Sequence, residues 1–389
     1  MSYTLHATSS YFGGNKMQVL LENFQYITFP MVIMWVIGGV LIYLAIAKEM
    51  EPTLLLPMGF GAILVNLPVA VEGTGIQHVL ETLFSIGIEG AELFPLMLFI
   101  GIGAMIDFTP LLTNPKLMIF GAAAQFGIFF TLALASLLGY DIRDAASIAI
   151  IGAADGPTSI FVAMSLGSKY LGAIMVAAYS YMALVPLIQP PIIKLCTTKA
   201  ERKIKMQYKG KPVSKLTKIL FPIVVTVIVA LVAPDAVALI GFLMFGNLIR
   251  ECGVMNSISE TAQNALANLI TIFLGITIAS QMKAADFLQL DTLIIIGLGL
   301  VAFVFDTFGG IMVAKIMNLF AKEKINPMIG AAGISAFPMS ARVVHKMGLE
   351  EDNQNFLLMH SIGVNVSGQI ASVIAGGLIL ALVKAMIGG

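Results

Sequence analysis

The sequence predicts an all-α polytopic membrane protein made of two inverted repeats, in which broken or re-entrant helices meet at the bilayer midplane. Three observations support this fold class: the composition, the recurrence of long apolar runs, and a similarity between the two halves. The chain has 389 residues, of which 58% are hydrophobic and 11% charged, against about 25% charged in soluble domains. A soluble core cannot hide that much apolar surface, so we expect the chain to reside in a membrane.

Apolar runs recur from one end of the chain to the other, and many are long enough to cross the roughly 30 Å of bilayer hydrocarbon. Others are too short, or too interrupted by Gly and Pro, to cross alone, which indicates re-entrant or broken helices. We predict spans near residues 30–47, 54–71, 93–107, 117–139, 145–165, 170–195, 219–249, 266–281, 292–317, 325–341 and 356–386.

Charge and cysteine content exclude several functions. The 22 basic and 22 acidic residues cancel, so the chain lacks the overall basic charge that nucleic-acid binding requires. Cys196 and Cys252 match no metal-ligand spacing, which argues against a zinc site or a disulfide framework. The first 20 residues do not read as a signal peptide. We interpret residues 1–27 as an N-terminal interfacial segment, with a solvated lead-in as the alternative.

One polar segment, residues 196–218, divides the chain near its middle. It holds eight basic residues against the single acid Glu201, and by the positive-inside rule we place it in the cytoplasm. It separates a first membrane repeat, residues 28–195, from a second, residues 219–389. Besides setting topology, such a loop offers a surface on which a soluble partner can dock.

The two halves resemble each other in motif and in spacing. Residues 99–107 (FIGIGAMID) match residues 273–281 (FLGITIASQ), and the tetrapeptide IGAA occurs at 151–154 and at 329–332. Weak internal symmetry of this kind is typical of transporters whose ion sites lie where discontinuous helices of two repeats meet.

The break in the first half lies in residues 150–161, IIGAADGPTSIF. Gly152 and Gly156 permit backbone conformations that other residues resist, and the following proline suits the first turn of a new helix. Asp155 then precedes a helix N-terminus, which favours a carboxylate, and Thr158 supplies a hydroxyl oxygen. An acid this deep in an apolar span is a functional hypothesis by default; the alternative is an acid paired only to hold helices together.

The break in the second half lies in residues 325–344, INPMIGAAGISAFPMSARVV. Here Asn326 and Ser335 offer neutral oxygens, and Arg342 offers a guanidinium. The joint site is therefore suited to Na⁺ on one side and a carboxylated ligand on the other, because Arg pairs with a planar carboxylate through two parallel hydrogen bonds. The alternative for Arg342 is a side chain that snorkels to the interface.

Further polar residues follow each break and either line the same cavity or join helices. They are Tyr179, Ser180 and Tyr181 in the first half, and His360, Ser361, Asn365, Ser367 and Gln369 in the second. We expect Asp107 and Asp306 to lie at span ends or in packing contacts.

Four segments resemble the beta subunits of the sodium-pumping biotin-dependent decarboxylases, which act on oxaloacetate, methylmalonyl-CoA, glutaconyl-CoA or malonate. The segments are GAADGPTSIF, AAYSYMALVPLIQPPIIKLCTTKAERKI, NPMIGAAGISAFPMSARVV and NFLLMHSIGVNVSGQIAS. They occur in order, and weaker similarity covers nearly the whole chain. One departure is Val364 before Asn365, where the family usually has Gly-Pro-Asn.

The resemblance implies roles for individual residues, because the family's functional positions fall on residues of this chain. The implied catalytic residues are Asp155, Tyr181 and Arg342. The residues implied to bind carboxybiotin are Arg342, Asn326 and Ser335. The implied Na⁺ ligands are Asp155, Ser335, Asn365, Thr158 and Gly330.

The resemblance also implies partners and a location. A carboxyltransferase alpha subunit moves CO₂ onto biotin, a biotin carrier subunit delivers carboxybiotin, and a small membrane gamma subunit completes the complex in the bacterial inner membrane. Biotin would be attached to the carrier and not to this chain, and self-association is left open. Decarboxylation would then drive Na⁺ outward, with Tyr181 or protonated Asp155 as proton donor. The alternatives are a sodium-coupled carboxylate transporter, a Na⁺/H⁺ antiporter or a passive membrane anchor.

Overall fold

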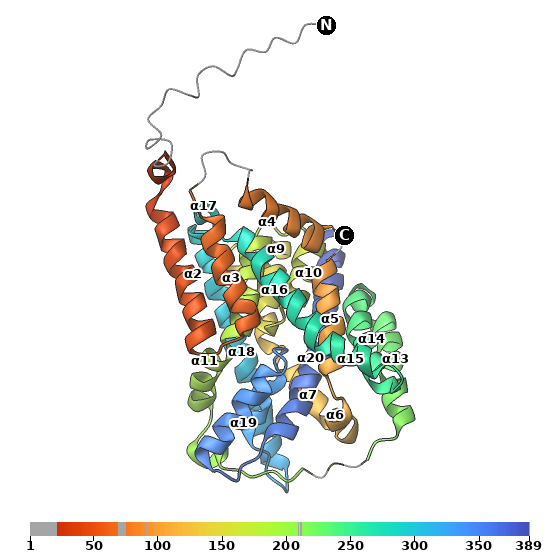
Figure 1. The fold of residues 1–389 in the computed structure, drawn as a ribbon. Helices are drawn as coiled ribbons and strands as arrows, with labels where there is room; N and C mark the ends of the chain where they lie inside the picture. Colours follow the sequence, from red (N-terminus) through yellow and green to blue (C-terminus); the bar gives the residue numbers. More distant parts are fainter. Residues whose placement is uncertain (1–21, 69–74, 91, 209, 211, 389) are drawn as a thin grey trace, which may run out of the picture.

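The computed structural model describes residues 22–68, 75–90, 92–208, 210 and 212–388, and these residues form a bundle of helices (Figure 1). Within this part of the chain there is no strand, which confirms the all-α class. Most of the predicted N-terminal segment, residues 1–21, lies outside the described residues. Among the described residues, seven helices are long and apolar enough to cross a membrane: Phe29–Ala47, Pro115–Leu137, Leu171–Cys196, Lys215–Val232, Asn256–Gln281, Leu290–Phe320 and Leu358–Gly388.

The helices of the first half run to the end of the predicted first repeat. They are η1 Glu22–Tyr26, α2 Phe29–Ala47, α3 Pro52–Val65, α4 Ile76–Phe84, η2 Ser85–Glu89, α5 Leu93–Met105, α6 Thr109–Thr113, η3 Pro115–Leu117, α7 Met118–Ala123, α8 Phe126–Leu137, α9 Ile142–Ala149, η4 Ile150–Ala153, α10 Gly156–Ser165 and α11 Leu171–Cys196.

The helices of the second half begin in the basic loop. They are α12 Lys199–Arg202, α13 Lys215–Val232, η5 Pro234–Ala236, α14 Val237–Cys252, α15 Asn256–Thr261, η6 Ala262–Leu266, α16 Ala267–Ile278, η7 Ala279–Gln281, α17 Ala284–Phe287, α18 Leu290–Phe320, η8 Pro327–Gly333, α19 Met339–Glu351 and α20 Leu358–Gly388.

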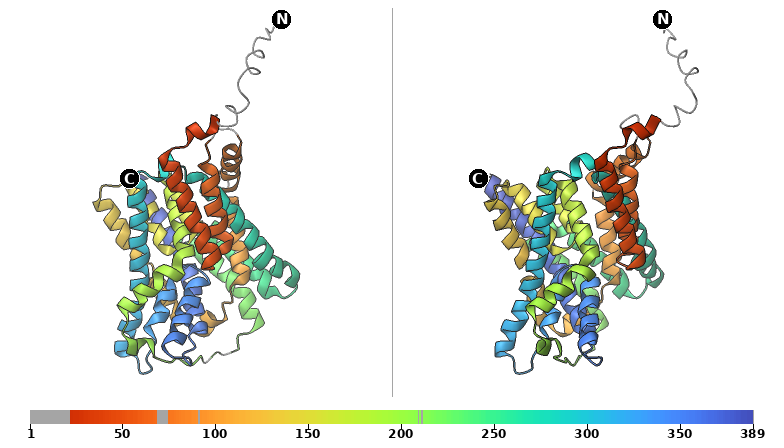
Figure 2. Two further views of the ribbon diagram at one scale, coloured as in Figure 1. Left: turned by 60° about the vertical axis from the view of Figure 1, so that its left-hand side comes forward. Right: turned by 90° about the vertical axis from the view of Figure 1, so that its left-hand side faces the viewer.

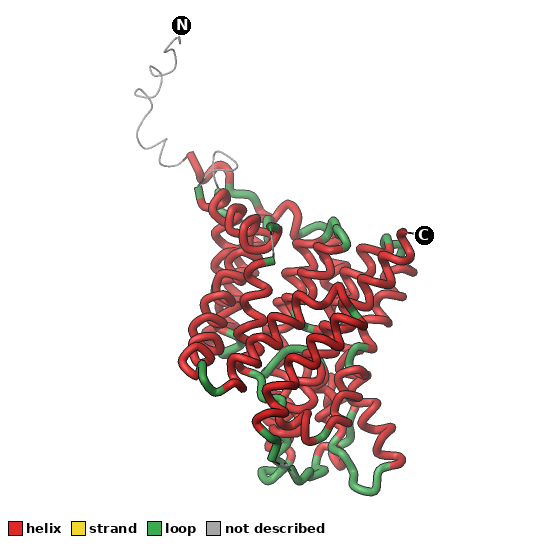
Figure 3. The backbone as a smooth tube through the Cα atoms, turned by 90° about the vertical axis from the view of Figure 1, so that its right-hand side faces the viewer, coloured by secondary structure: helices red, strands yellow, loops and turns green. Residues whose placement is uncertain are grey.

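The predicted span at residues 219–249 is wrong as a single helix. These residues form two helices, α13 and α14, because Pro234 lacks a backbone N–H and restricts the residue before it, so the chain turns through η5. Residues 325–341, which lie in the second predicted break, form the 3₁₀ helix η8, an extended stretch and the start of α19. Figure 3 shows such non-helical stretches inside the bundle as well as at its ends.

The first predicted break is the tip of a hairpin. Helix α9 enters the bundle, the chain turns at Ala154 and Asp155, and α10 leads back out. The two ends of this hairpin lie together, because the Ser168 hydroxyl donates to Asp144 Oδ1 at 2.7 Å. The segment is therefore re-entrant, as expected of an interrupted run that cannot cross alone.

The second break is also a hairpin, made of η8 and α19, and it enters from the end of the bundle that carries the basic loop (Figure 1). Its base is closed by one backbone oxygen, because Asn326 Nδ2 and Asn355 Nδ2 both donate to the Arg202 carbonyl, at 2.9 and 2.8 Å. Two hairpins thus enter the protein from opposite ends. The inverted repeat and the boundaries 28–195, 196–218 and 219–389 stay predictions.

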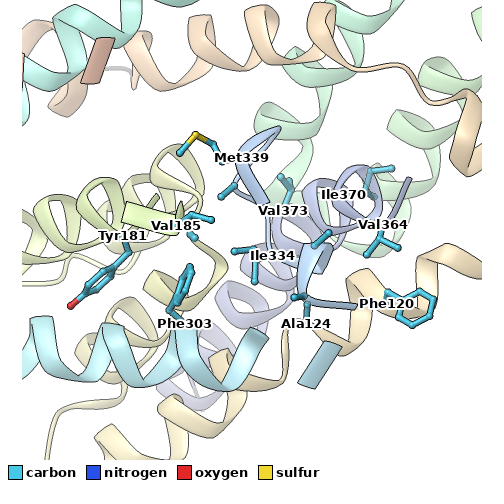
Figure 4. Packing of buried hydrophobic residues seen from close by; sticks show 14 of the residues in the cluster. Phe120, Ala124, Tyr181, Val185, Phe303, Ile334, Met339, Val364, Ile370 and Val373 are labelled. Carbon is cyan, nitrogen blue, oxygen red and sulfur yellow. The ribbon is translucent and has the colours of Figure 1, made fainter. Parts of the chain in front are cut away.

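The core has two main apolar clusters. One lies among α2, α3, α5 and α16 and includes Met58 and Leu274; Figure 2 shows α2 and α3 standing side by side at one edge of the bundle. The other surrounds both hairpins and includes Phe303 of α18 and Ile334 of the second hairpin. In Figure 4, Ile334 lies among Val185, Phe303 and Val373, which belong to α11, α18 and α20.

At Gly310 and Gly330, the backbones of helix α18 and the second hairpin pack directly against each other. A Cβ on Gly310 would lie 2.1 Å from the Gly330 carbonyl oxygen, and a Cβ on Gly330 would lie 2.1 Å from the Gly310 carbonyl oxygen. Each residue is therefore a glycine because no side chain fits between the two segments.

We predict that Gly310→Ala lowers the thermal stability of the purified protein, because even one methyl group would push the hairpin away from α18, at a cost of about 1–3 kcal/mol. Gly297→Ala is the matched control, since a Cβ at Gly297 of the same helix would meet nothing within 4 Å. Thermal aggregation in detergent measures both. Equal midpoints for the two variants would contradict the packing described.

Candidate functional site

Asp155 begins helix α10 and is 3% exposed. Its backbone is extended, and its Oδ1 accepts the Thr158 backbone N–H at 3.4 Å, while the Thr158 hydroxyl donates to its Oδ2 at 2.8 Å. This is the N-cap arrangement that the break predicts, in which a carboxylate takes up orphan donors of a helix start. The local sequence thus places the carboxylate at the hairpin tip.

Three further donors reach the same carboxylate oxygen from distant parts of the chain. Asp155 Oδ2 accepts the Ser335 hydroxyl at 3.1 Å, the Ser372 hydroxyl at 3.2 Å and Gln369 Nε2 at 3.3 Å. Ser335 belongs to the second hairpin, whereas Gln369 and Ser372 belong to α20. The site therefore lies where both hairpins meet one long helix, and all of its hydrogen-bond donors are uncharged.

The two hairpin tips also pair through their backbones. The Ser335 backbone N–H donates to the Ala153 carbonyl at 3.0 Å. Asn365 of α20 supports the same tip, since its Nδ2 donates to the Ile334 carbonyl at 2.7 Å. Broken helix ends that face each other in this way satisfy polar groups that lipid cannot.

Two buried amide oxygens at the site have no hydrogen-bond partner within the described residues: Asn365 Oδ1 and Gln369 Oε1. Hard cations such as Na⁺ bind oxygen ligands, and these two atoms add to the carboxylate of Asp155 and the hydroxyls of Thr158 and Ser335. No group of three or more His, Cys, Asp or Glu side chains gathers in the described part of the chain. A set made only of oxygen ligands suits a hard cation.

The expected role of the glycines in the first break needs a correction. The residue with a left-handed backbone is Ala154, at φ 50°, and not a glycine. Gly152 and Gly156 instead permit close packing, since a Cβ on Gly156 would lie 2.2 Å from the ring of Tyr179. Tyr179 is fully buried, and its hydroxyl has no partner within the described residues.

The other residues that the family resemblance implicates lie outside this cluster of oxygens. Tyr181 is 7% exposed and its hydroxyl donates to the Ile296 carbonyl at 2.5 Å. Arg342 is exposed on α19, and its positive charge attracts the carboxylate of Glu51 in the turn between α2 and α3. Asn326 lies at the base of the second hairpin, where it binds the basic loop.

Three of the five predicted Na⁺ ligands lie together, because the hydroxyls of Thr158 and Ser335 both donate to the carboxylate of Asp155. Asn365 contacts the residue before Ser335, because its side chain donates to the Ile334 carbonyl. Gly330 lies earlier in the second hairpin, against Gly310.

Sequence reasoning did not select Gln369 and Ser372 as ligands. A signal was present, because Asn365, Gln369 and Ser372 follow one another at spacings of four and three residues and therefore share one face of a helix. In a span this apolar, such a polar stripe indicates a face turned toward the interior.

Ion pairs attach the basic loop to the second hairpin and, through Lys315, to helix α18. Arg202 Nε lies 2.6 Å from Glu351 Oε1, Lys205 Nζ lies 3.1 Å from Asp352 Oδ2, and Lys315 Nζ lies 3.2 Å from Glu201 Oε1. The hydrogen bond from Arg202 lowers the pKa of Glu351 below its ordinary value of 4.5. The loop is thus part of the hairpin's base.

We predict that Glu351→Gln lowers the thermal midpoint at about pH 6 by about 2–4 °C, and that this difference shrinks as the pH falls below 4.5. Because folding depresses the pKa of Glu351, its contribution is present above the unfolded value of 4.5 and is lost as the pH falls through the folded value. Glu350→Gln, at the exposed neighbouring acid, is the control. A difference that persists in acid would rule out the ion pair as its source.

Comparisons with known proteins show which family the chain resembles. Residues 30–383 match the family model described as Na⁺-transporting oxaloacetate decarboxylase beta subunit. The chain is 50% identical over 376 residues to the methylmalonyl-CoA decarboxylase subunit beta of Propionigenium modestum, covering 90% of this chain and 94% of that protein.

Two further relatives act on other substrates by name. The chain is 46% identical over 413 residues to the oxaloacetate decarboxylase beta chain of Klebsiella pneumoniae, covering 91% of this chain and 95% of that one. It is 49% identical over 365 residues to the glutaconyl-CoA decarboxylase subunit beta of Acidaminococcus fermentans, covering 93% and 96%. The likeness extends over nearly the whole chain in each case.

Proposed function

The chain belongs to the family of beta subunits of Na⁺-transporting oxaloacetate decarboxylase, and from that premise we propose that it decarboxylates carboxybiotin and couples this reaction to Na⁺ export. Membership makes it one subunit of a multi-subunit decarboxylase in the bacterial inner membrane. The observation that carries the proposal is the site at Asp155, where two hairpins from opposite ends of the bundle and helix α20 converge on one buried carboxylate.

Na⁺ would bind at Asp155 as the transported substrate. Its charge neutralises the carboxylate, and the hydroxyls of Thr158, Ser335 and Ser372 turn their lone pairs toward it. The amides of Asn365 and Gln369 supply the oxygens that have no partner otherwise. A bare carboxylate in the middle of the bilayer is costly, so loss of Na⁺ favours uptake of a proton at the same oxygens.

Decarboxylation needs a proton, because the ureido nitrogen takes one as its bond to the carboxyl carbon breaks and CO₂ leaves. Protonated Asp155 is the donor that we favour, since the Tyr181 hydroxyl already donates its proton to the Ile296 carbonyl. Proton loss would regenerate the carboxylate that binds the next Na⁺. One acid would then couple the chemical step to ion exchange.

The carboxylate of carboxybiotin would be held by Arg342, which is exposed on α19 and free to make two parallel hydrogen bonds. Helix α19 leads from the hairpin tip to the basic loop, where a soluble biotin carrier and a carboxyltransferase alpha subunit would dock. Asn326 would act by holding that loop to the hairpin base. A small gamma subunit would join the complex within the membrane.

We expect Asp155→Asn to abolish Na⁺-dependent carboxybiotin decarboxylation and Na⁺ transport together, because the amide neither neutralises Na⁺ nor releases a proton. Purified protein reconstituted in vesicles with a biotin carrier, assayed with radioactive sodium, measures both. Retention of Na⁺-dependent turnover by this variant would refute the coupling. Carboxybiotin loss without sodium movement would refute the pump, and sodium movement without carboxybiotin would favour a secondary transporter.

We also predict that Ser372→Ala weakens the apparent Na⁺ affinity by roughly 10-fold, because a hydrogen-bonding group facing a charge contributes about 1.5–3 kcal/mol. Ser367→Ala is the matched control: Ser367 is equally buried on α20, but its hydroxyl bonds the Leu117 and Val364 carbonyls and not Asp155. The Na⁺ concentration that gives half-maximal decarboxylation distinguishes them. Equal values for both variants would remove Ser372 from the site.

A further inference from the structure

A second carboxyl lies in the interior and takes no part in the proposed Na⁺ site. Asp306 is in the middle of α18 and is 0% exposed, whereas Asp107 follows the end of α5 and pairs with Lys218 at 3.9 Å. Of the two acids expected at span ends or in packing contacts, only Asp107 therefore lies at a span end. An acid buried this deeply in a membrane protein requires a physical account.

One oxygen of Asp306 is used in capping helix α8. Its Oδ1 accepts the Ile128 backbone N–H at 3.2 Å, and the Gly127 backbone N–H also contacts the carboxyl group. These amides belong to the first turn of α8, which begins at Phe126 after the break that follows α7. A helix start leaves such donors without partners inside the helix, and Asp306 supplies one from a different helix.

The other oxygen, Oδ2, is buried and has no hydrogen-bond partner within the described residues. It faces the first hairpin, because a Cβ on Gly152 would lie 2.5 Å from Oδ2 and 2.6 Å from the Ala302 Cβ. Gly152 is three residues before Asp155. The backbone at Gly152 is packed so closely against Oδ2 that there is no room for Na⁺ with its shell of oxygen ligands. A proton needs no such shell.

We propose that Asp306 is a proton-binding site, in which Oδ2 carries the proton while Oδ1 remains the cap of α8. Binding is the reversible conversion of a carboxylate and H⁺ into a carboxylic acid. An unpaired neutral hydroxyl in an apolar environment costs much less free energy than an unpaired charge. Protonation therefore removes the larger penalty and leaves the helix cap intact.

The proton at Asp306 is distinct from the one that exchanges with Na⁺ at Asp155. It lies against the residues that lead into the first hairpin tip, so it lets a second acid contact that tip without adding a second negative charge beside the cation site. The interior then holds two carboxyls with different occupants: Na⁺ or a proton at Asp155, and a proton at Asp306.

Infrared spectroscopy of the full chain in lipid nanodiscs tests this assignment through the carbonyl stretch of a protonated carboxyl group. All samples carry Asp155→Asn, so the measurement is independent of the proposed Na⁺ site, and its outcome can be told apart from failure of the pump. We expect this parent to show the band at neutral pH, Asp306→Asn to weaken it, and Asp107→Asn to leave it unchanged.

Asparagine at 306 keeps an oxygen that can accept from the amides of α8, so it removes the proton with the least change in packing. A band of the same strength in the Asp306→Asn protein as in the parent would overturn the proposal. Absence of the band from the parent would overturn it as well, and that result requires no substitution at position 306.

Discussion

Polar groups in the middle of this bundle have to find partners within the protein, because hydrocarbon offers none. That constraint is most severe where the chain breaks its helices. At the hairpin tips, the Ser335 backbone N–H meets the Ala153 carbonyl, and four uncharged side-chain donors surround Asp155. The two hairpins therefore depend on each other, and the carboxylate is the point at which they are joined.

Helix α18 provides the surface against which both tips are held. It meets η4 through Asp306 and Gly152, and it meets η8 through Gly310 and Gly330, where backbones approach without side chains between them. Contacts this close leave little freedom for either tip to shift by itself. A change of charge or occupancy at Asp155 would act on a closely packed unit and not on a loose loop.

The two hairpin bases are built differently. The first is closed by a neutral serine on Asp144. The second is closed by asparagine side chains on the Arg202 carbonyl and by the ion pair between Arg202 and Glu351. Only the second base therefore involves the basic loop, which carries the positive charge expected on the cytoplasmic face. A soluble partner that binds to that loop would therefore affect the position of the second hairpin directly.

The sequence by itself determined the membrane location, the two breaks and the central acid. These follow from local rules: apolar length selects spans, Gly and Pro mark interruptions, and a carboxylate before a helix start acts as a cap, as at Asp155 with Thr158. Ser335 could be predicted as a site residue because the repeated IGAA motif indicated a corresponding second break. The family followed from four motifs, and the implied roles of Tyr181 and Arg342 came with it.

Only the tertiary structure decided which distant side chains reach Asp155, because a long apolar helix does not reveal which way its faces turn. Gln369 and Ser372 belong to the site because the packed structure turns their face of α20 toward Asp155. Asp306 is an interior acid because α18 packs against α8 and η4. The division of residues 219–249 into two helices at Pro234 has a local cause, the proline itself. The contacts at Asp155 and Asp306 arose from the packing of helices far apart in the chain, which short-range patterns do not encode.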